Sequence, residues 1–256
     1  MLRDVLLDIV KHTHSLGFIQ AVKLESTDEG TSVEAMDDDR TVVLKGKLKN
    51  KLDNVPGLIG MGRLGVLSGY LNYEAYGKDG ANIEVMTNTR DGVETAEELK
   101  FTSPGGYTAN YRFMVSSLIE EQLKTIKFKG VEWDITVQPT QQNIKDLTYF
   151  NGIMGGFEPT FVAKTDGDTL KFYIGDGAND RVEIPFAQNV QGKLTKGWAW
   201  PLAQVLSILK LSDTSQASMS FSDQGAMQIS VDTGTATYDY ILPARSQECP
   251  NHTEKI

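Results

Sequence analysis

The chain has one cysteine among its 256 residues and no long apolar run. The single residue, Cys249, cannot form a disulfide within the chain, so the composition favours a reducing compartment. Without an apolar run of about 18 residues, no transmembrane helix is expected. The first residues include Arg3 and Asp4 and lack the apolar stretch of a signal peptide. The sequence therefore predicts a soluble protein that needs no disulfides to fold.

Positive charge is also scarce. The chain has 25 Lys and Arg against 34 Asp and Glu, a formal net charge of -9. An even distribution of this charge would repel a phosphate backbone and argue against a nucleic-acid partner. The acids, however, fall in runs such as residues 37–39 and 97–98. The location of the bases therefore decides whether nucleic acid is excluded.

Common catalytic motifs are missing. The sequence has no G-x-S-x-G, H-E-x-x-H or P-loop pattern, which are signatures of hydrolases, metalloproteases and nucleotide-dependent enzymes. His12 and His14 would diverge on a helix and cannot share a metal there. Cys249 and His252 offer only two ligands, which make a weak site. We expect no catalytic residue, no metal, no cofactor and no enzymatic activity.

One glycine pattern resembles a nucleotide loop. Gly60, Gly62 and Gly65 have the G-x-G-x-x-G spacing, and a dinucleotide fingerprint needs a buried strand directly before it. Residues 49–56 are instead charged and end at Pro56, which does not fit a central strand. We favour close packing as the role of these glycines. A nucleotide-binding enzyme that uses residues 60–65 is the alternative.

The chain contains a long internal repeat. Apolar residues with helical spacing mark four segments, at about residues 2–16, 61–71, 141–154 and 201–211. The first and third start about 139 residues apart, and so do the second and fourth. Strands are predicted between them at 18–24, 31–35, 40–44, 83–87 and 107–115, and again at 160–163, 169–174, 181–186, 217–221, 227–231 and 236–242.

This order predicts an α+β fold with antiparallel sheets, in which two helices pack on the sheets of each of two duplicated domains. One irregular α+β domain is the alternative. We place the first domain at 1–115, a connector at 116–130, the second domain at 131–247 and a polar tail at 248–256. Asp37, Asp38 and Asp39 fit a solvated turn between strands better than a cation site.

The outward sides of the predicted helices carry basic, polar or small residues. One stripe of a helix can face the core while the opposite stripe faces out. Four such helices side by side would form a mildly basic surface suited to a non-specific hold on phosphates. Ordinary polar faces of amphipathic helices are the alternative. The outward residues that we single out are Arg3, Lys11, His14, Arg63, Lys145, Tyr149 and Lys210.

A second group of bases alternates along the chain. Lys45, Lys47, Lys49 and Lys51 would share one face of a strand. We favour a solvated or edge-protecting face for them, and a phosphate contact is the alternative. Aromatic residues are only 9% of the chain, too few for a base-stacking platform.

Three short stretches, together with the order of the elements, carry a resemblance to a known family. They are MGRLGVLS at 61–68, QNIKDL at 142–147 and YDYILPA at 238–244. Over about residues 1–245 the chain resembles the DNA sliding clamps of tailed phages and proliferating cell nuclear antigen. These proteins are processivity factors for DNA polymerases.

The resemblance implies a closed homotrimer, with two domains per subunit, around double-stranded DNA. Helices would line the hole, and sheets would continue across the subunits. Such a ring holds DNA by encirclement and needs little attraction, which is compatible with the net charge of -9. The implied partners are DNA polymerase and an ATP-dependent clamp loader, in the cytoplasm of an infected bacterial cell. No membrane partner is implied.

The resemblance also implies roles for single residues. Arg3, Lys11, Arg63, Lys145 and Lys210 match positions where clamps place bases toward DNA, and Tyr149 stands where a base is expected. Glu120 and Glu121 make the connector acidic, and the tail at 248–256 has no counterpart. A structural virion or interaction protein remains a third interpretation. The implied partner-peptide pocket comprises Leu118, Ile119, Leu123, Ile241, Leu242 and Pro243.

Overall fold

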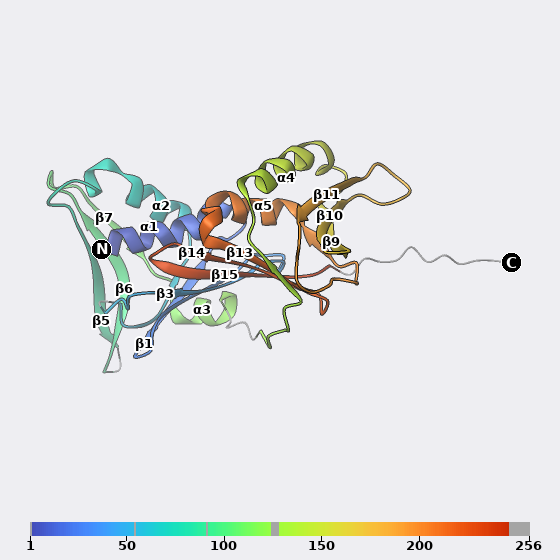
Figure 1. Cartoon of the computed structure of the whole chain (residues 1–256). Coiled ribbons are helices and arrows are strands. Elements are labelled where there is room, and N and C mark those ends of the chain that lie inside the picture. Colours follow the sequence, from blue (N-terminus) through green and yellow to red (C-terminus); the bar gives the residue numbers. More distant parts are fainter. Residues whose placement is uncertain (1, 54, 91, 124–127, 246–256) are drawn as a thin grey trace.

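The computed structural model describes residues 2–53, 55–90, 92–123 and 128–245 (Figure 1). The predicted tail at 248–256, with Cys249 and His252, therefore lies outside the described residues, as do Lys124 and Lys127 of the connector. The chain forms an elongated body in which the four longer helices lie along one side of twisted sheets and one short helix lies on the other side (Figure 1).

Each half of the chain repeats one order of elements: a helix, four strands, a second helix, a 3-10 turn and three strands. The first half contains α1 (Leu2–His12), η1 (His14–Leu16), β1 (Val22–Thr27), β2 (Gly30–Met36), β3 (Val43–Leu48), β4 (Gly57–Met61), α2 (Leu64–Asn72), η2 (Glu74–Tyr76), β5 (Asn82–Arg90), β6 (Val93–Thr102) and β7 (Thr108–Arg112).

The second half follows α3 (Ser116–Gln122) and one added strand, β8 (Ile135–Val137). It contains α4 (Gln141–Met154), β9 (Thr160–Asp166), β10 (Thr169–Ile174), β11 (Val182–Ala187), β12 (Ala199–Pro201), α5 (Leu202–Leu211), η3 (Thr214–Gln216), β13 (Ala217–Ser222), β14 (Ala226–Asp232) and β15 (Ala236–Pro243). The predicted duplication is confirmed, whereas the exact domain boundaries stay predictions.

Every strand pairing is antiparallel, as the sequence predicts. The largest sheet has eight strands in the order β4-β1-β2-β3-β15-β14-β13-β8, and smaller sheets follow the orders β11-β10-β9-β12 and β5-β6-β7. In the large sheet β3 of the first half pairs with β15 of the second, with Tyr238 opposite Gly46. This pairing makes one sheet continuous across the two halves.

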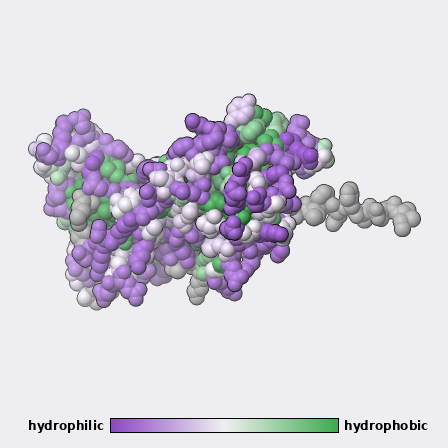
Figure 2. Space-filling view, in the orientation of Figure 1, coloured by the Kyte–Doolittle hydropathy of each residue, from purple (hydrophilic) through white to green (hydrophobic). Residues whose placement is uncertain are grey.

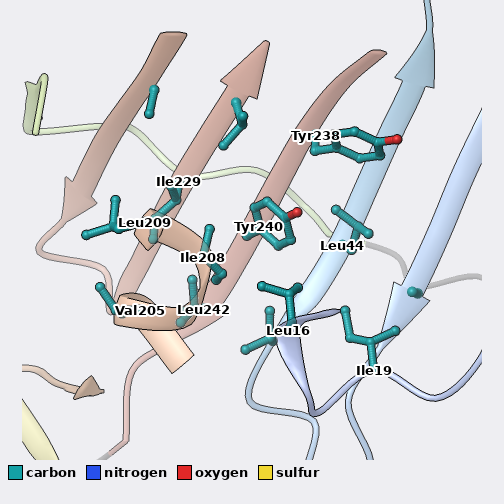
Figure 3. Packing of buried hydrophobic residues seen from close by; sticks show 14 of the residues in the cluster. Leu16, Ile19, Leu44, Val205, Ile208, Leu209, Ile229, Tyr238, Tyr240 and Leu242 are labelled. Carbon is teal, nitrogen blue, oxygen red and sulfur yellow. The ribbon is translucent and has the colours of Figure 1, made fainter. Parts of the chain in front are cut away.

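The four long helices form a row over the inner faces of the sheets. α1 packs against α2 and α5, and α5 also packs against α4, which gives the order α2, α1, α5, α4 (Figure 1). Both halves supply the core beneath this row. Leu16 and Leu44 come from the first half and Ile208, Ile229 and Tyr238 from the second, and all five are buried (Figure 3).

Several predicted boundaries were wrong for local reasons. The first helix ends at His12 instead of residue 16, because the chain changes to a 3-10 turn that Gly17 closes at φ 87°. The second helix starts at Leu64, since its N-cap, Arg63, has the left-handed φ of 50°. The third helix matches its prediction, and a capping box between Thr140 and Asn143 fixes its start.

Candidate nucleic-acid interface

The row of helices exposes four of the seven predicted interface residues as charged side chains. Lys11 lies on α1, Arg63 at the start of α2, Lys145 on α4 and Lys210 near the end of α5, and all four are exposed. A row of neighbouring helices is therefore the structural reason that residues from both halves share one side of the molecule.

Arg3 has an additional structural role. Its Nε and Nη2 atoms donate hydrogen bonds to the carbonyl oxygen of Leu71, at 3.2 and 2.7 Å. Leu71 lies in the last turn of α2, where carbonyl groups lack helical partners and attract positive charge. Arg3 is partly buried, so its guanidinium ties α1 to α2 and leaves only part of the group accessible to an outside phosphate.

His14 does not share the helical stripe of Arg3 and Lys11, so its predicted position was wrong. It lies in η1 after α1 has ended, and its ring packs close to Gly65 at the start of α2. Its Nδ1 atom is buried and has no hydrogen-bond partner within the described part of the chain. The 3-10 turn changes the angle per residue, which a helical projection cannot anticipate.

Sequence reasoning singled out Tyr149 as outward-facing but missed the apolar stripe to which it belongs. Tyr149 is 65% exposed, Ile153 is 51% exposed and Phe157, just beyond the helix, is 85% exposed. The four-residue spacing places Tyr149 and Ile153 on one side of the helix, and Phe157 follows shortly after the helix ends at Met154. Figure 2 shows apolar surface on the second half of the chain, above the sheet of which β11 is an edge strand. The spacing was visible in the sequence, but burial on the opposite stripe was needed to show that this one faces out.

The helix row is only mildly basic. α1, α2, α4 and α5 together contain Arg3, Lys11, Lys145 and Lys210 against three acids, Asp4, Asp8 and Asp146. The rest of the chain carries the large acidic excess. Such a surface can meet phosphates without holding them tightly, since each neutralised phosphate adds to affinity and few bases are available.

A polar cluster beneath α1 joins the two halves. The Tyr238 hydroxyl donates to Asp8 Oδ2 at 2.9 Å, and the ring of His12 stacks on Tyr238 with centroids 4.7 Å apart. The Tyr240 hydroxyl donates to the His12 carbonyl at 2.9 Å and lies 3.1 Å from His12 Nδ1. That hydroxyl has already donated its proton, so Nδ1 of His12 is the donor in the second contact.

Burial controls the titration of this cluster. Burial lowers the pKa of His12 to about 4, with Asp8 raising it and Lys11 lowering it to smaller extents. Burial, together with the nearby Asp8 carboxylate, raises the pKa of Tyr238 and Tyr240 above their ordinary value. His12 is thus neutral at pH 7 and acts as a structural hydrogen-bond donor. Sequence reasoning missed these residues because their partners are more than 200 positions away.

Two of the four alternating lysines, Lys45 and Lys47, lie on the opposite face of the large sheet from the helices, whereas Lys49 lines a pocket with Lys11 and His12 of α1. Lys45 and Lys47 stand on β3, and Lys49 follows it and makes a 2.7 Å ion pair with Asp232. Lys51 lies 3.7 Å from Asp28. Asp37 accepts hydrogen bonds from the Val42 N–H and the Thr41 hydroxyl, which confirms a turn here. Asp38 and Asp39 are exposed as predicted, whereas Asp37 is buried.

The glycines of residues 60–65 are packing sites, as predicted. A Cβ atom on Gly60 would come within 2.7 Å of Ile119 on α3, and one on Gly65 would meet the His14 ring at 3.4 Å. The carbonyl of Gly62 accepts a hydrogen bond from the buried Tyr111 hydroxyl. β4 and its neighbour β1 are antiparallel, unlike the parallel strands of a dinucleotide fold.

The predicted peptide pocket is only partly assembled. Ile119 is buried against β4, Leu118 is 39% exposed, and Leu123 is partly buried. Ile241 lies on β15, four strands from β4 in the large sheet, which corresponds to about 19 Å at roughly 4.8 Å per strand. Residues 124–127, which follow Leu123 in the sequence, lie outside the described residues.

One residue of the predicted pocket is wrong. Leu242 points into the core with Tyr238 and Tyr240, and its exposure is 0% (Figure 3). Side chains alternate along a strand, so Ile241 and Pro243 face the other side of the sheet, where Pro243 is exposed but Ile241 is buried at 5% exposure. A continuous run of apolar residues in β15 concealed this alternation in the sequence.

Comparison with known proteins gives its clearest result at the level of three-dimensional structure. No protein-family model matches the sequence, and no curated protein matches it. PCNA from Thermococcus kodakaraensis has a TM-score of 0.67 at 12% identity, covering 96% of this chain and 97% of that one. A. fulgidus PCNA, solved with the C-terminal region of FEN-1 bound, has a TM-score of 0.70 at 10% identity, with the same coverages of 96% and 97%. The PCNA2-PCNA3 complex from Sulfolobus tokodaii gives 0.61 at 13% identity, covering 95% and 96%.

The chain has the fold of a sliding clamp. Nearly the whole length of each clamp chain is matched, so the likeness includes both halves and their relative arrangement. At 10–13% identity the shared property is the fold. No helix in the described ranges is long and apolar enough to cross a bilayer.

Six strands of the described residues have a strand neighbour on one side only, and two of these edge strands, β7 and β11, belong to different halves of the chain. In the described residues β7 pairs with β6 alone, and β11 pairs with β10 alone. The two strands lie at opposite ends of the molecule (Figure 1). Unpaired backbone donors and acceptors at such edges favour pairing with another chain.

Proposed function

We propose that this chain is one subunit of a ring-shaped DNA sliding clamp, a non-enzymatic processivity factor that encircles duplex DNA and tethers a replicative DNA polymerase. One observation carries the proposal: four helices lie in a row across both halves, and the edge strands β7 and β11, at opposite ends of the molecule, each have one side without a strand partner in the described residues (Figure 1). Edge strands that can pair with a neighbouring subunit fit a ring-shaped assembly better than a monomer.

The two free edges differ, which determines the kind of assembly. β7 belongs to the first half and β11 to the second, so contact between them is head-to-tail. Head-to-tail contacts produce a closed ring when the rotation per subunit divides a full turn, and a filament otherwise. We propose a homotrimer, in which each subunit contributes two halves. The proposed number of subunits rests on the resemblance to trimeric clamps.

Encirclement accounts for the charge distribution. A closed ring keeps its hold on DNA by topology, so strong attraction is unnecessary and would slow movement along the duplex. Lys11, Arg63, Lys145 and Lys210 would face the phosphates, with Tyr149 beside them and with Arg3 and His14 contributing mainly to packing. The acidic excess of the remaining chain would lie outside the ring, beyond about one Debye length of 8–10 Å from the DNA.

Short peptides would dock on the outside of the ring. One structural neighbour was solved with the C-terminal region of FEN-1 bound to it. We propose that the polymerase and an ATP-dependent clamp loader bring similar segments to the surface near Leu118, Leu123, Ile241 and Pro243. In keeping with the tailed-phage resemblance, the proposed setting is the cytoplasm of an infected bacterial cell.

The test combines mass with topology. Sedimentation equilibrium at micromolar concentration should give about three times the subunit mass of 28.2 kDa. Subunits would then be diluted, mixed with nicked circular plasmid and reconcentrated so that rings assemble around DNA. Protein should co-elute with the circular plasmid in high salt and leave after linearisation. A monomeric chain, or equal retention on linear and circular DNA, would contradict the proposal.

A further inference from the structure

In the second half of the chain, β13 has a strand on each side. It pairs with β14 on one side and with the short strand β8 on the other. On β8, Ile135 and Val137 are buried at 1% and 9% exposure. Thr136 between them is exposed, and its hydroxyl lies 2.8 Å from that of Ser220 on β13. Three residues with an apolar–polar–apolar pattern thus complete this end of the sheet.

In the first half, β5 is the counterpart of β13. β5 follows α2 and η2 in the same way that β13 follows α5 and η3. Within the described residues, however, β6 is the one strand that pairs with β5. β5 is nine residues long and is the outermost strand at its end of the molecule (Figure 1). Its outer edge therefore offers backbone donors and acceptors to another strand.

The repeat aligns β5 with β13 residue by residue. Met114 forms a bridge with Gly60 after β7, and Arg245 forms the same kind of bridge with Ala199 after β15. Three residues before each bridge a row of directly opposed residues begins. The two rows run Tyr111–Leu99–Val85 in the first half and Leu242–Met227–Phe221 in the second. They end at matching positions of β5 and β13.

The inward side chains of β5 are less covered than their counterparts on β13. The rows match Val85 with Phe221, and the alternation of side chains matches Ile83 with Met219 two residues earlier. Phe221 and Met219 are both 0% exposed, whereas Val85 and Ile83 are only partly buried. A strand beside β5, at the place that β8 takes beside β13, would cover this remaining apolar surface.

The outer face of β5 adds a preference for positive charge. Glu84 is exposed and stands where β13 has Ser220. It is the one ionisable residue among residues 82–89. Lys100 of β6 lies opposite Glu84 on the paired side. A base on an incoming strand would complete a row of base, acid and base across three strands, in which opposite charges attract across each pair.

We propose that the outer edge of β5 binds an extended segment of a separate partner protein as an added antiparallel strand. Two apolar residues of the segment face the core beside Val85 and Ile83, and a lysine or arginine between them lies beside Glu84. Backbone hydrogen bonds at such an edge supply affinity, and the alternating side chains supply specificity. A second copy of β5 is a poorer occupant, because antiparallel pairing centred on Glu84 would place two carboxylates opposite each other.

This site is separate from the edges that the proposed ring would use. In the sheet order β5-β6-β7, β5 and β7 are opposite edges, so a bound segment and a neighbouring subunit can occupy the sheet together. Binding at β5 also does not require a ring. A chain that stays monomeric and binds the segment would overturn the ring proposal and leave this site standing.

A peptide copied from β8 is the probe for this site. It comprises residues 132–139 of this chain with Thr136→Lys, carries a fluorescent label and is titrated with the full chain, and its anisotropy should rise to saturation. The control peptide has the same charge and adds Ile135→Ser and Val137→Ser. It should bind at least about tenfold more weakly, because two buried apolar side chains are lost. No saturable binding of the lysine peptide, or equal affinities of the two peptides, would overturn the inference.

A charge exchange locates the bound peptide on β5. Glu84→Lys in the chain should weaken binding of the lysine peptide and strengthen binding of a peptide with Thr136→Glu, each by about fivefold, as for charge pairs across strands. The gain with the second peptide also shows that the variant is folded. Glu183→Lys on β11 makes the same change in net charge and should alter neither affinity. Unchanged affinities in Glu84→Lys, or the same changes in Glu183→Lys, would contradict binding at β5.

Amide hydrogen exchange of the full chain tests whether the edge is open. In the free chain the amides of β5 should on average exchange faster than those of β13, because local protection follows strand pairing. The lysine peptide should slow the exchange of β5. Amides of β5 that are already as protected as those of β13 in the free chain would show that another part of this protein, or another copy, covers the edge, and would overturn the inference.

Discussion

At the residue scale, the most constrained group is His12. Its side chain is 2% exposed, stacks on Tyr238 and contacts Tyr240, so one imidazole links α1 to the last strand. Protonation of Nε2 would place a positive charge in a buried site. Asp8, the nearest acid, already accepts hydrogen bonds from Tyr238 and Thr233.

This predicts an acid-sensitive fold. The pKa of His12 is about 4 in the folded chain, against about 6.5 when unfolded. Between those values the unfolded chain binds more protons, so the stability contributed by neutral His12 is complete above pH 6.5 and is lost as pH falls toward 4. The loss should approach about 3 kcal/mol, at about 1.4 kcal/mol per pH unit.

Urea unfolding between pH 7 and pH 4 measures this effect. The His12→Phe variant keeps an aromatic ring against Tyr238 but cannot titrate, so its stability should fall less steeply with acidification. Carboxylates titrate in both proteins, so their contribution to the pH dependence of stability cancels when the two proteins are compared. Identical slopes for the two proteins would show that His12 is not the titrating group.

At the element scale, the packing of α3 on β4 depends on the absence of a side chain. Ile119 of α3 occupies the space where a Gly60 Cβ would lie, and Met114 closes the other side at 3.1 Å. The connector therefore starts from a fixed helix on the outer face of the sheet. Any partner surface that includes Leu118 depends on this anchor.

Two identical substitutions should have opposite effects. Gly60→Ala should lower the free energy of unfolding by about 1–3 kcal/mol, because overpacking displaces Ile119. Gly69→Ala should raise it by up to about 1 kcal/mol, because Gly69 lies in α2 with nothing within 4 Å and alanine favours helix. Chemical denaturation of both variants provides the measurement. An unchanged stability of Gly60→Ala would indicate that α3 is not fixed against β4.

At the scale of the whole molecule, lysines lie on two opposite faces of the sheets. The helix row carries Lys145 and Lys210, whereas Lys45 and Lys47 lie on the opposite face of the sheet. Substitutions that change DNA binding are therefore expected in the helix row and not on the opposite face. Arg3 is unsuited to such a test, because its guanidinium also holds Leu71.

Charge reversal on the two faces separates these surfaces. Lys145→Glu with Lys210→Glu should weaken association with circular plasmid on the order of tenfold at low salt. Lys45→Glu with Lys47→Glu makes the same change in net charge and should weaken it much less. Both variants should keep the mass of the wild-type assembly. Equal losses from the two pairs would indicate that net charge, rather than the helix row, governs binding.

The sequence by itself determined the α+β class, the antiparallel sheets, the duplication and the position of α4. Hydrophobic spacing and turn residues are local signals, and the same signals occur in both halves of the repeat. It did not determine the end of α1, where a 3-10 turn displaces His14, or the face on which Leu242 lies within the apolar run at 240–243 of β15.

Only the tertiary structure decided which residues meet. Tyr238 lies 230 positions from Asp8, and Arg3 lies 68 from Leu71, separations at which local spacing carries no information. The pairing of β3 with β15 buries Tyr238, whereas Tyr107, just before the edge strand β7, is 63% exposed. Burial depends on what the folded chain places opposite a residue, and the linear sequence does not contain that arrangement directly.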